Sequence, residues 1–257
     1  MFSGTGLRYS GAVARILCDK PTGADPVAVA IQQLVTTGAS LMGSFGVTRS
    51  LGVDRDEWTR FARHWEDLAP DPYAAELGIQ RLRRYGRYLL RDGIAEPMPA
   101  EPFVQPDNSN PLYIDRDRHF EPLTDAFADD PLLVGLLRML CRVAAALDDV
   151  AEWNVKVHPF RLESPAHGDG RPTPEGLHRD GVTLVSSLLV GRRNAIGGES
   201  TVCDLSGHTL LTTTLEEPGT LLLGDDRRTQ HGVSPIRPID GSGPAVRDVL
   251  VITFASR

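Results

Sequence analysis

Apolar residues recur at every third or fourth position in two segments of the first part of the chain. One segment covers residues 24–43 and the other covers residues 129–149. Asp25 and Asp130 precede the two apolar stripes at the position of a helix cap, and a proline follows each of them at the first helical position. We therefore predict a helix in each segment, and we expect the second helix to pack its apolar stripe on a sheet.

The second part of the chain changes to short segments with the residue types of β-strands, separated by turns rich in Gly and Pro. Six such segments cover residues 153–162, 183–190, 200–205, 208–215, 219–226 and 247–254. No helical pattern interrupts them, which indicates antiparallel strands. The predicted fold is mostly β with flanking helices, and its core is a double-stranded β-helix of the jelly-roll or cupin-like type.

We expect residues 1–257 to form a single domain, because this length suits one large hydrophobic core. Residues 151–257 form the main jelly-roll core, and residues 1–150 form a helical and irregular part. A full jelly roll has about eight strands, so the first part is expected to add one or two, placed in the region 84–122.

Composition argues against several classes of protein. The formal net charge of −7 disfavours non-specific binding to nucleic acid, and no basic cluster indicates a membrane surface. No apolar run approaches the length of a membrane span, and the first residues lack the charged-then-apolar order of a signal peptide. We therefore expect a cytoplasmic protein that acts on a small molecule.

Cysteine and lysine are both scarce. Cys18, Cys141 and Cys203 are far apart and form no Cys-x-x-Cys pair, which is typical of free thiols in a reducing compartment. Lys20 and Lys156 are the only lysines, so almost every cationic side chain is an arginine. A carboxylate bound by this protein is therefore expected to be held by a planar guanidinium group.

Two His-x-Asp pairs are candidates for metal ligands. His167 and Asp169 lie in a stretch rich in Gly and Pro, which is poorly suited to hold a rigid pair of side chains. His178 and Asp180 directly precede the predicted strand at 183–190. Ligand side chains need supports that fix their rotamers, so we prefer the second pair.

A second histidine would complete a set of two imidazoles and one carboxylate, the facial triad that suits non-haem Fe(II). Downstream of His178 only His208 and His231 are available. His231 follows 53 residues later, between two predicted strands, which leaves room for the chain to travel around a jelly roll and return. His208 begins a strand after a turn and is expected to be exposed. We therefore predict a metal site made of His178, Asp180 and His231.

Arg247 stands at the head of the predicted strand 247–254, where an arginine that enters a buried strand needs an anionic partner. One interpretation is a salt bridge with Asp248 or Asp240. The other is a bidentate contact with the distal carboxylate of a 2-oxoacid.

Other polar residues near these motifs have ordinary interpretations. His158 is typical of a structural histidine within a strand. Asp225 and Asp226 are expected to form a turn or to pair with Arg227 and Arg228.

Four segments of the chain resemble the 2-oxoglutarate/Fe(II)-dependent dioxygenases. In chain order they are HRDG, GGES, DDRRTQHGVSPI and RDVLVITF. The likeness is to the bacterial group typified by the L-isoleucine hydroxylases. The segments RYGRY and FEPL and the stretch 105–110 are also similar to that group. The resemblance runs from about residue 70 to the C-terminus and is most specific over 158–254.

This resemblance implies a double-stranded β-helix that binds Fe(II) through His178, Asp180 and His231. It also implies that 2-oxoglutarate chelates the iron through its keto acid end, that Arg247 holds the far carboxylate, and that O2 is the oxidant. Members of the group hydroxylate free aliphatic L-amino acids. An iron-bound carboxylate at Asp180, in place of a vacant position for halide, favours hydroxylation over halogenation.

An amino-acid substrate needs partners for its carboxylate and its ammonium group. Glu199 in the GGES segment is the candidate for the ammonium group. The candidates for the carboxylate are Arg161, Arg83, Arg84, Arg87 and Arg116.

Two alternatives to this hydroxylase remain open on sequence alone. The same iron site is compatible with desaturation or with an amino acid tethered to a carrier. A cupin-like barrel that binds a metal or ligand without redox turnover shares the strands and histidines but does not need Arg247.

Overall fold

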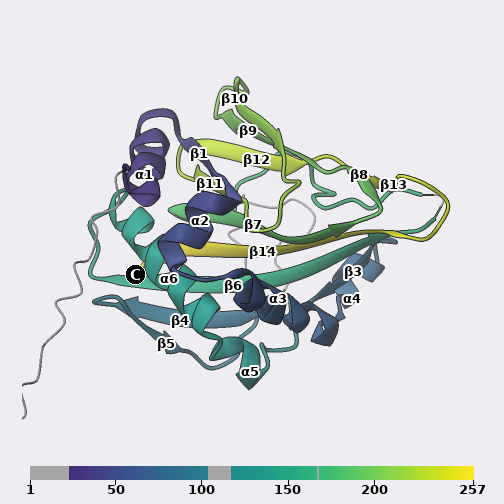
Figure 1. Cartoon of the computed structure of the whole chain (residues 1–257), viewed down its shortest axis with the longest axis horizontal. Helices are drawn as coiled ribbons and strands as arrows, with labels where there is room; N and C mark the ends of the chain where they lie inside the picture. Colours follow the sequence, from purple (N-terminus) through teal and green to yellow (C-terminus); the bar gives the residue numbers. More distant parts are fainter. Residues whose placement is uncertain (1–22, 104–116, 167) are drawn as a thin grey trace, which may run out of the picture.

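The two longest strands of the fold, β6 (Glu152–Ser164) and β14 (Ala245–Ser256), pair antiparallel along almost their whole length (Figure 1). They form the centre of a nine-stranded sheet in a computed structural model that describes residues 23–103, 117–166 and 168–257. The sequence-based candidates Cys18, Arg116 and His167 and the stretch 105–110 lie outside these described residues.

The large sheet has the strand order β1-β11-β7-β14-β6-β3-β2, with β4 also paired to β6 and β5 paired to β4. Its other strands are β1 (Ala39–Met42), β2 (Ala69–Pro70), β3 (Gln80–Arg83), β4 (Gly86–Arg91), β5 (Ile94–Pro97), β7 (Leu184–Arg193) and β11 (Leu221–Asp225). Opposite this sheet lie a three-stranded and a two-stranded sheet (Figure 1). They contain β10 (Thr209–Thr214), β9 (Glu199–Asp204) and β12 (Thr229–Val233), and β13 (Ile236–Pro238) with β8 (Ala195–Gly197). The mostly β class and the jelly-roll core that the sequence predicts are both confirmed.

Helices cover the other face of the large sheet and enclose the main hydrophobic core with it (Figure 1). They are α1 (Pro26–Thr37), α2 (Ser44–Leu51), α3 (Arg55–Ala62), the 3-10 helix η1 (Arg63–Asp67), α4 (Pro72–Ala75), α5 (Asp125–Ala128) and α6 (Pro131–Ala145). The predicted caps are present, because Asp25 accepts a hydrogen bond from Val27 N at 3.0 Å and Asp130 accepts one from Leu132 N at 2.8 Å. The apolar stripe of α6 is buried against the sheet, as expected.

The first predicted helix is shorter than its apolar pattern indicates. Gly38 adopts the left-handed conformation, with φ +89°, and ends α1. Residues 39–42, which we expected to continue the helix, instead form β1 and pair with β11. The prediction over 24–43 was wrong at this end because apolar spacing alone does not separate the last helical turn from a short buried strand.

The first 150 residues also supply more strands than the one or two that the sequence indicated, since β1 to β5 all come from this part. Residues 80–91, a segment rich in Arg and Tyr, form β3 and β4. These two strands pair with different parts of the long strand β6. This pairing matters for the site, because β3 brings Arg81 and Arg83 to the cavity between the sheets.

Alternation along the central strands sends one set of side chains to each face of the large sheet. On β14, Leu250 and Ile252 belong to the core beneath the helices, whereas Val249 and Val251 line a cavity on the opposite face. The same strand therefore stabilises the fold with one face and builds the site with the other.

No helix within the described ranges combines the length and the apolar composition that crossing a bilayer requires.

Removing a side chain at the interface between helix and sheet tests this arrangement. Leu136 on α6 is fully buried, so we expect Leu136→Ala to lower the free energy of unfolding by about 2–5 kcal/mol. Arg138→Ala, an exposed change on the same helix, should alter it by less than about 0.5 kcal/mol. Urea unfolding followed by circular dichroism measures both, and equal effects of the two changes would contradict the packing.

Candidate metal centre

A short backbone bridge joins the two histidines that the sequence analysis selected. His178 lies in the loop before β7, and His231 lies within β12 instead of between two strands. His178 N donates to His231 O at 3.0 Å, and His231 N donates to His178 O at 2.9 Å. The two rings consequently lie side by side, with their centroids 4.4 Å apart.

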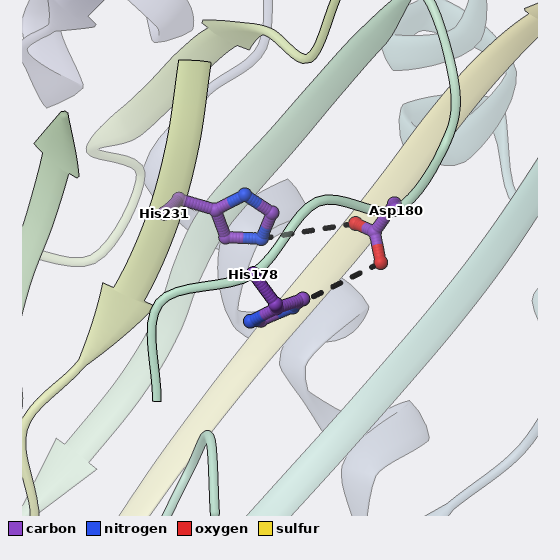
Figure 2. Close-up of side chains that lie close together, drawn as sticks. All are labelled: His178, Asp180 and His231. Carbon is purple, nitrogen blue, oxygen red and sulfur yellow. Dashed lines mark ion pairs between the residues drawn. The ribbon is translucent and has the colours of Figure 1, made fainter. Parts of the chain in front are cut away.

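Asp180 completes a triad on the same side of this bridge (Figure 2). One carboxylate oxygen of Asp180 is 3.9 Å from His178 Nε2, and the other is 3.7 Å from His231 Nε2. One ligand atom from each of the three residues lies within 4.8 Å of the others. The structure therefore brings together the three residues that the sequence predicted, at separations that one metal ion can span.

The protonation of the two rings suits metal binding. His178 Nδ1 is 3.1 Å from the carbonyl oxygen of Gly176, so Nδ1 carries the proton and Nε2 keeps its lone pair. Burial lowers the pKa of His231 to about 4, against the opposing effect of the Asp180 charge, so this ring is neutral at neutral pH. A neutral imidazole is the form that binds a metal.

Asp226 fixes the loop that carries the triad. Its carboxylate is fully buried and accepts backbone hydrogen bonds from Asp180 at 3.1 Å, Gly181 at 2.7 Å and Val182 at 3.0 Å. It also faces His231, whose buried Nδ1 has no hydrogen-bond partner among the described residues and lies 3.9 Å from Asp226 Oδ1. Asp226 therefore contacts the backbone of Asp180 and faces the ring of His231, two of the three members of the triad.

The turn and the arginine pairs expected for Asp225 and Asp226 are both present, but the two side chains have different partners. Asp225 does pair with Arg227 and Arg228, at 3.0 and 2.9 Å. Asp226 turns instead toward the loop with the triad. Burial, and secondarily the negative charge of Asp180, raises its pKa to about 6.

Arg247 enters the same cavity from β14 without an acidic partner among the residues that the structure describes. Its side chain is 3% exposed, and its Nε and Nη2 atoms are buried and make no hydrogen bond. Burial, together with the neighbouring charge of Arg192, lowers its pKa to about 10, so the guanidinium group remains charged at neutral pH. A buried cation of this kind requires an anion, and Asp248 and Asp240, the alternatives from the sequence, bond elsewhere.

The GGES segment makes a tight turn next to this arginine. Gly197 and Gly198 both have positive φ, at +76° and +69°. A Cβ atom on Gly197 would lie 2.2 Å from the carbonyl oxygen of Pro235, and one on Gly198 would lie 3.5 Å from Arg247 Cδ. The two glycines thus allow the chain to turn tightly beside the Arg247 side chain.

The arginines that the sequence proposed for a substrate carboxylate lie in different environments. Arg161 is held by Asp248 at 2.8 and 2.9 Å and by Glu66 at 2.8 Å, on the face of β6 away from the cavity. Arg84 is half-buried and donates to the carbonyl oxygens of Asp67 and Pro122. Neither lines the cavity, so the prediction that they contact substrate gains no support from their positions.

Glu199 and Arg87 are also outside the cavity lining. Glu199 begins β9 and accepts a backbone hydrogen bond from Ser234, and Arg87 pairs with the exposed Glu101. Arg83, in contrast, is buried and lines the cavity.

Sequence reasoning did not select Lys156 or Arg118 for the site and interpreted His158 as structural, but all three line the cavity. Lys156 and His158 occupy alternate positions of β6, and Arg118 joins them from the segment before α5. The alternating pattern along residues 153–162 could have identified two of these residues, because it places Lys156 and His158 on one face of the strand.

The chain belongs to the 2OG-Fe dioxygenase family, whose model matches residues 62–253. This family uses Fe(II), 2-oxoglutarate and O2, which fits the triad of two histidines and an aspartate.

Individual relatives agree with this family. The chain is 26% identical over 205 residues to the 3(1)-hydroxy-L-isoleucine 4-dioxygenase of Pantoea ananatis (strain AJ13355), covering 77% of this chain and 81% of that protein. The crystal structure of a bsmA homolog from Methylobium petroleophilum PM1 is 34% identical, with a TM-score of 0.81 and coverage of 90% and 93%. IDO from Bacillus thuringiensis shares the fold at 19% identity, with a TM-score of 0.75 and coverage of 93% and 98%.

Replacing the carboxylate of Asp226 tests how the metal site is held in place. Asp226→Asn retains the shape but loses charge and one or more acceptor contacts to the loop, so we expect metal affinity to fall by about ten- to a hundredfold. Titration with Co(II), followed by its visible spectrum, measures this affinity without turnover. Asp149→Asn, an exposed change, is the control; identical affinities in the two variants would contradict the supporting role.

Proposed function

We propose that this dioxygenase hydroxylates an unactivated C–H bond of a free L-amino acid with an aliphatic side chain, or of a close derivative of one. One observation carries the proposal: the triad and the unpaired, buried guanidinium of Arg247 share one cavity between the sheets. Such a cavity can accept a metal together with a small anionic co-substrate.

His178, Asp180 and His231 are the residues that would hold Fe(II), because two imidazoles and one carboxylate leave positions open for other ligands. With its cofactors bound, a dioxygenase of this family converts 2-oxoglutarate and O2 to succinate and CO2 and transfers one oxygen atom to the substrate C–H bond. The carboxylate of Asp180 would serve as a ligand in the place that a halide would otherwise need, which favours hydroxylation over halogenation.

Arg247 is the proposed partner for the distal carboxylate of 2-oxoglutarate. Its unpaired Nε and Nη2 atoms can donate two parallel hydrogen bonds to one carboxylate. Ser200 lines the same cavity, and its buried hydroxyl also makes no hydrogen bond to any residue that the structure describes. The two side chains together offer three donors for one anionic group.

An aliphatic amino acid is supported by the relative from Pantoea ananatis, whose name gives a hydroxylated L-isoleucine as its substrate. The cavity also presents apolar wall next to the triad, from Val182, Val185 and Val251. A small aliphatic side chain can pack on these valines while charged groups of the substrate meet the polar part of the wall.

Turnover with free amino acids tests the substrate class. We expect succinate formation from 2-oxoglutarate with Fe(II) to rise when L-valine, L-leucine or L-isoleucine is added, and the product to gain the mass of one oxygen atom. His231→Ala should abolish both, because one of three ligands is lost. Loss of two hydrogens would identify desaturation instead, and a response only to carrier-bound amino acids would contradict a free substrate.

Arg247→Gln tests the co-substrate contact. It removes charge-assisted hydrogen bonds, so we expect the KM for 2-oxoglutarate to rise by roughly ten- to a hundredfold. The anaerobic complex with Fe(II) should then need correspondingly more 2-oxoglutarate to develop its visible charge-transfer band. Arg60→Gln, on the exposed surface of α3, should leave both values unchanged. An unaltered KM in Arg247→Gln would place the distal carboxylate elsewhere.

A further inference from the structure

Arg83 and His158 form a buried pair on the cavity wall, contributed by β3 and β6. Arg83 Nη2 lies 2.6 Å from His158 Nδ1, and the two residues are 3% and 4% exposed. A guanidinium group can only donate hydrogen bonds, so Nδ1 of the ring is the acceptor. The ring proton is therefore fixed on Nε2.

Aromatic rings hold both members of the pair in place. The His158 ring stacks on Tyr85 with centroids 4.9 Å apart and meets the edge of Phe103 at 4.9 Å. The Arg83 guanidinium lies 3.5 Å from the ring centre of Phe120. This packing holds the His158 ring in the orientation that directs Nδ1 to Arg83.

The imidazole is also held neutral. Burial, followed by the nearby charges of Arg83 and Lys156, keeps the pKa of His158 well below its ordinary value. His158 thus presents one N–H donor at a fixed position, and within the described chain no acceptor contacts its Nε2 atom.

The surroundings of this donor favour an anion. Lys156 precedes it by two positions on the same face of β6, and Arg118 lines the cavity beside it. Both cations lie over the Phe103 ring, at 4.7 and 4.8 Å from its centre. Among the described residues of the cavity wall, the acidic side chains are Glu175 and Asp180, which both lie next to His178.

We propose that the Arg83–His158 pair is the subsite that binds the carboxylate of the substrate. His158 donates its Nε2–H to a carboxylate oxygen, Arg83 positions the ring, and Lys156 and Arg118 supply positive charge. This assignment rests on the proposed amino-acid substrate. It includes Arg83 from the arginines that the sequence proposed for the carboxylate, whereas Arg161 and Arg84 do not line the cavity.

Two substitutions of His158 separate a substrate contact from simple packing. In His158→Asn the amide oxygen takes the place of Nδ1 and still accepts from Arg83, but the Nε2 donor is lost. In His158→Gln the amide nitrogen takes the place of Nε2 and can still donate. We expect the first variant to bind the amino acid roughly ten- to a hundredfold more weakly, and the second to be affected less.

Binding is measured in the anaerobic complex with Fe(II) and 2-oxoglutarate, from the change in its charge-transfer band when L-valine, L-leucine or L-isoleucine is added. The amide of each amino acid is the comparison ligand. Wild type should prefer the acid strongly, and His158→Asn should lose most of that preference. The affinity for 2-oxoglutarate should stay the same in both variants, and His208→Asn, at an exposed histidine, should match wild type.

The possible results are distinguishable. Unchanged preference for the acid in His158→Asn, with a normal charge-transfer band, would overturn the subsite and leave the proposed function intact. Equal weakening of acid, amide and 2-oxoglutarate would show that His158 only supports packing, which also overturns it. If no amino acid alters the wild-type band, the proposed substrate class fails first and the subsite assignment fails with it.

Discussion

The metal centre depends on the backbone bridge between His178 and His231, because the loop that carries His178 and Asp180 has no regular structure of its own. Asp226 completes this constraint by accepting three backbone hydrogen bonds from the loop. The arrangement brings two carboxylates close together, and their repulsion is one reason why the pKa of Asp226 is raised, after burial. A divalent cation bound at the triad would offset that repulsion, so the protein part of the site is complementary to a metal in charge as well as in geometry.

The acidic and the basic residues that line the cavity lie on different elements of the fold. Glu175 and Asp180 lie at the triad, where Glu175 Oε1 is 3.6 Å from His178 Nε2. The arginines and the lysine lie on β3, β6 and β14 and in the segment before α5. Under the proposed function, the basic part of the wall would hold the carboxylate of an amino acid away from the acidic residues, and this would orient the carbon atom that faces the metal. In such a site specificity comes from orientation as much as from the size of the pocket.

Local patterns were sufficient to predict α6, most strands of the core and the His178–Asp180 pair, because each depends on residues close together in the chain. The metal partner His231 could be selected since few histidines follow the pair. The role of Asp226 and the contact between Arg83 and His158 could not be predicted in this way. Arg83 and His158 are 75 residues apart, and they meet only through the register in which β3 pairs with β6.

The register of β14 against β6 explains why Arg247 has no acidic partner among the described residues, although an aspartate follows it directly. Side chains alternate along β14, so Arg247 faces the cavity while Asp248 faces the opposite side of the sheet. Asp248 is paired there with Arg161, its partner across the strands, and Arg161 also binds Glu66. Shifting the pairing by one residue would turn Asp248 into the cavity and Arg247 out of it. The long β6–β14 ladder therefore does more than stabilise the fold, because it keeps one buried cation available for an anion from solution.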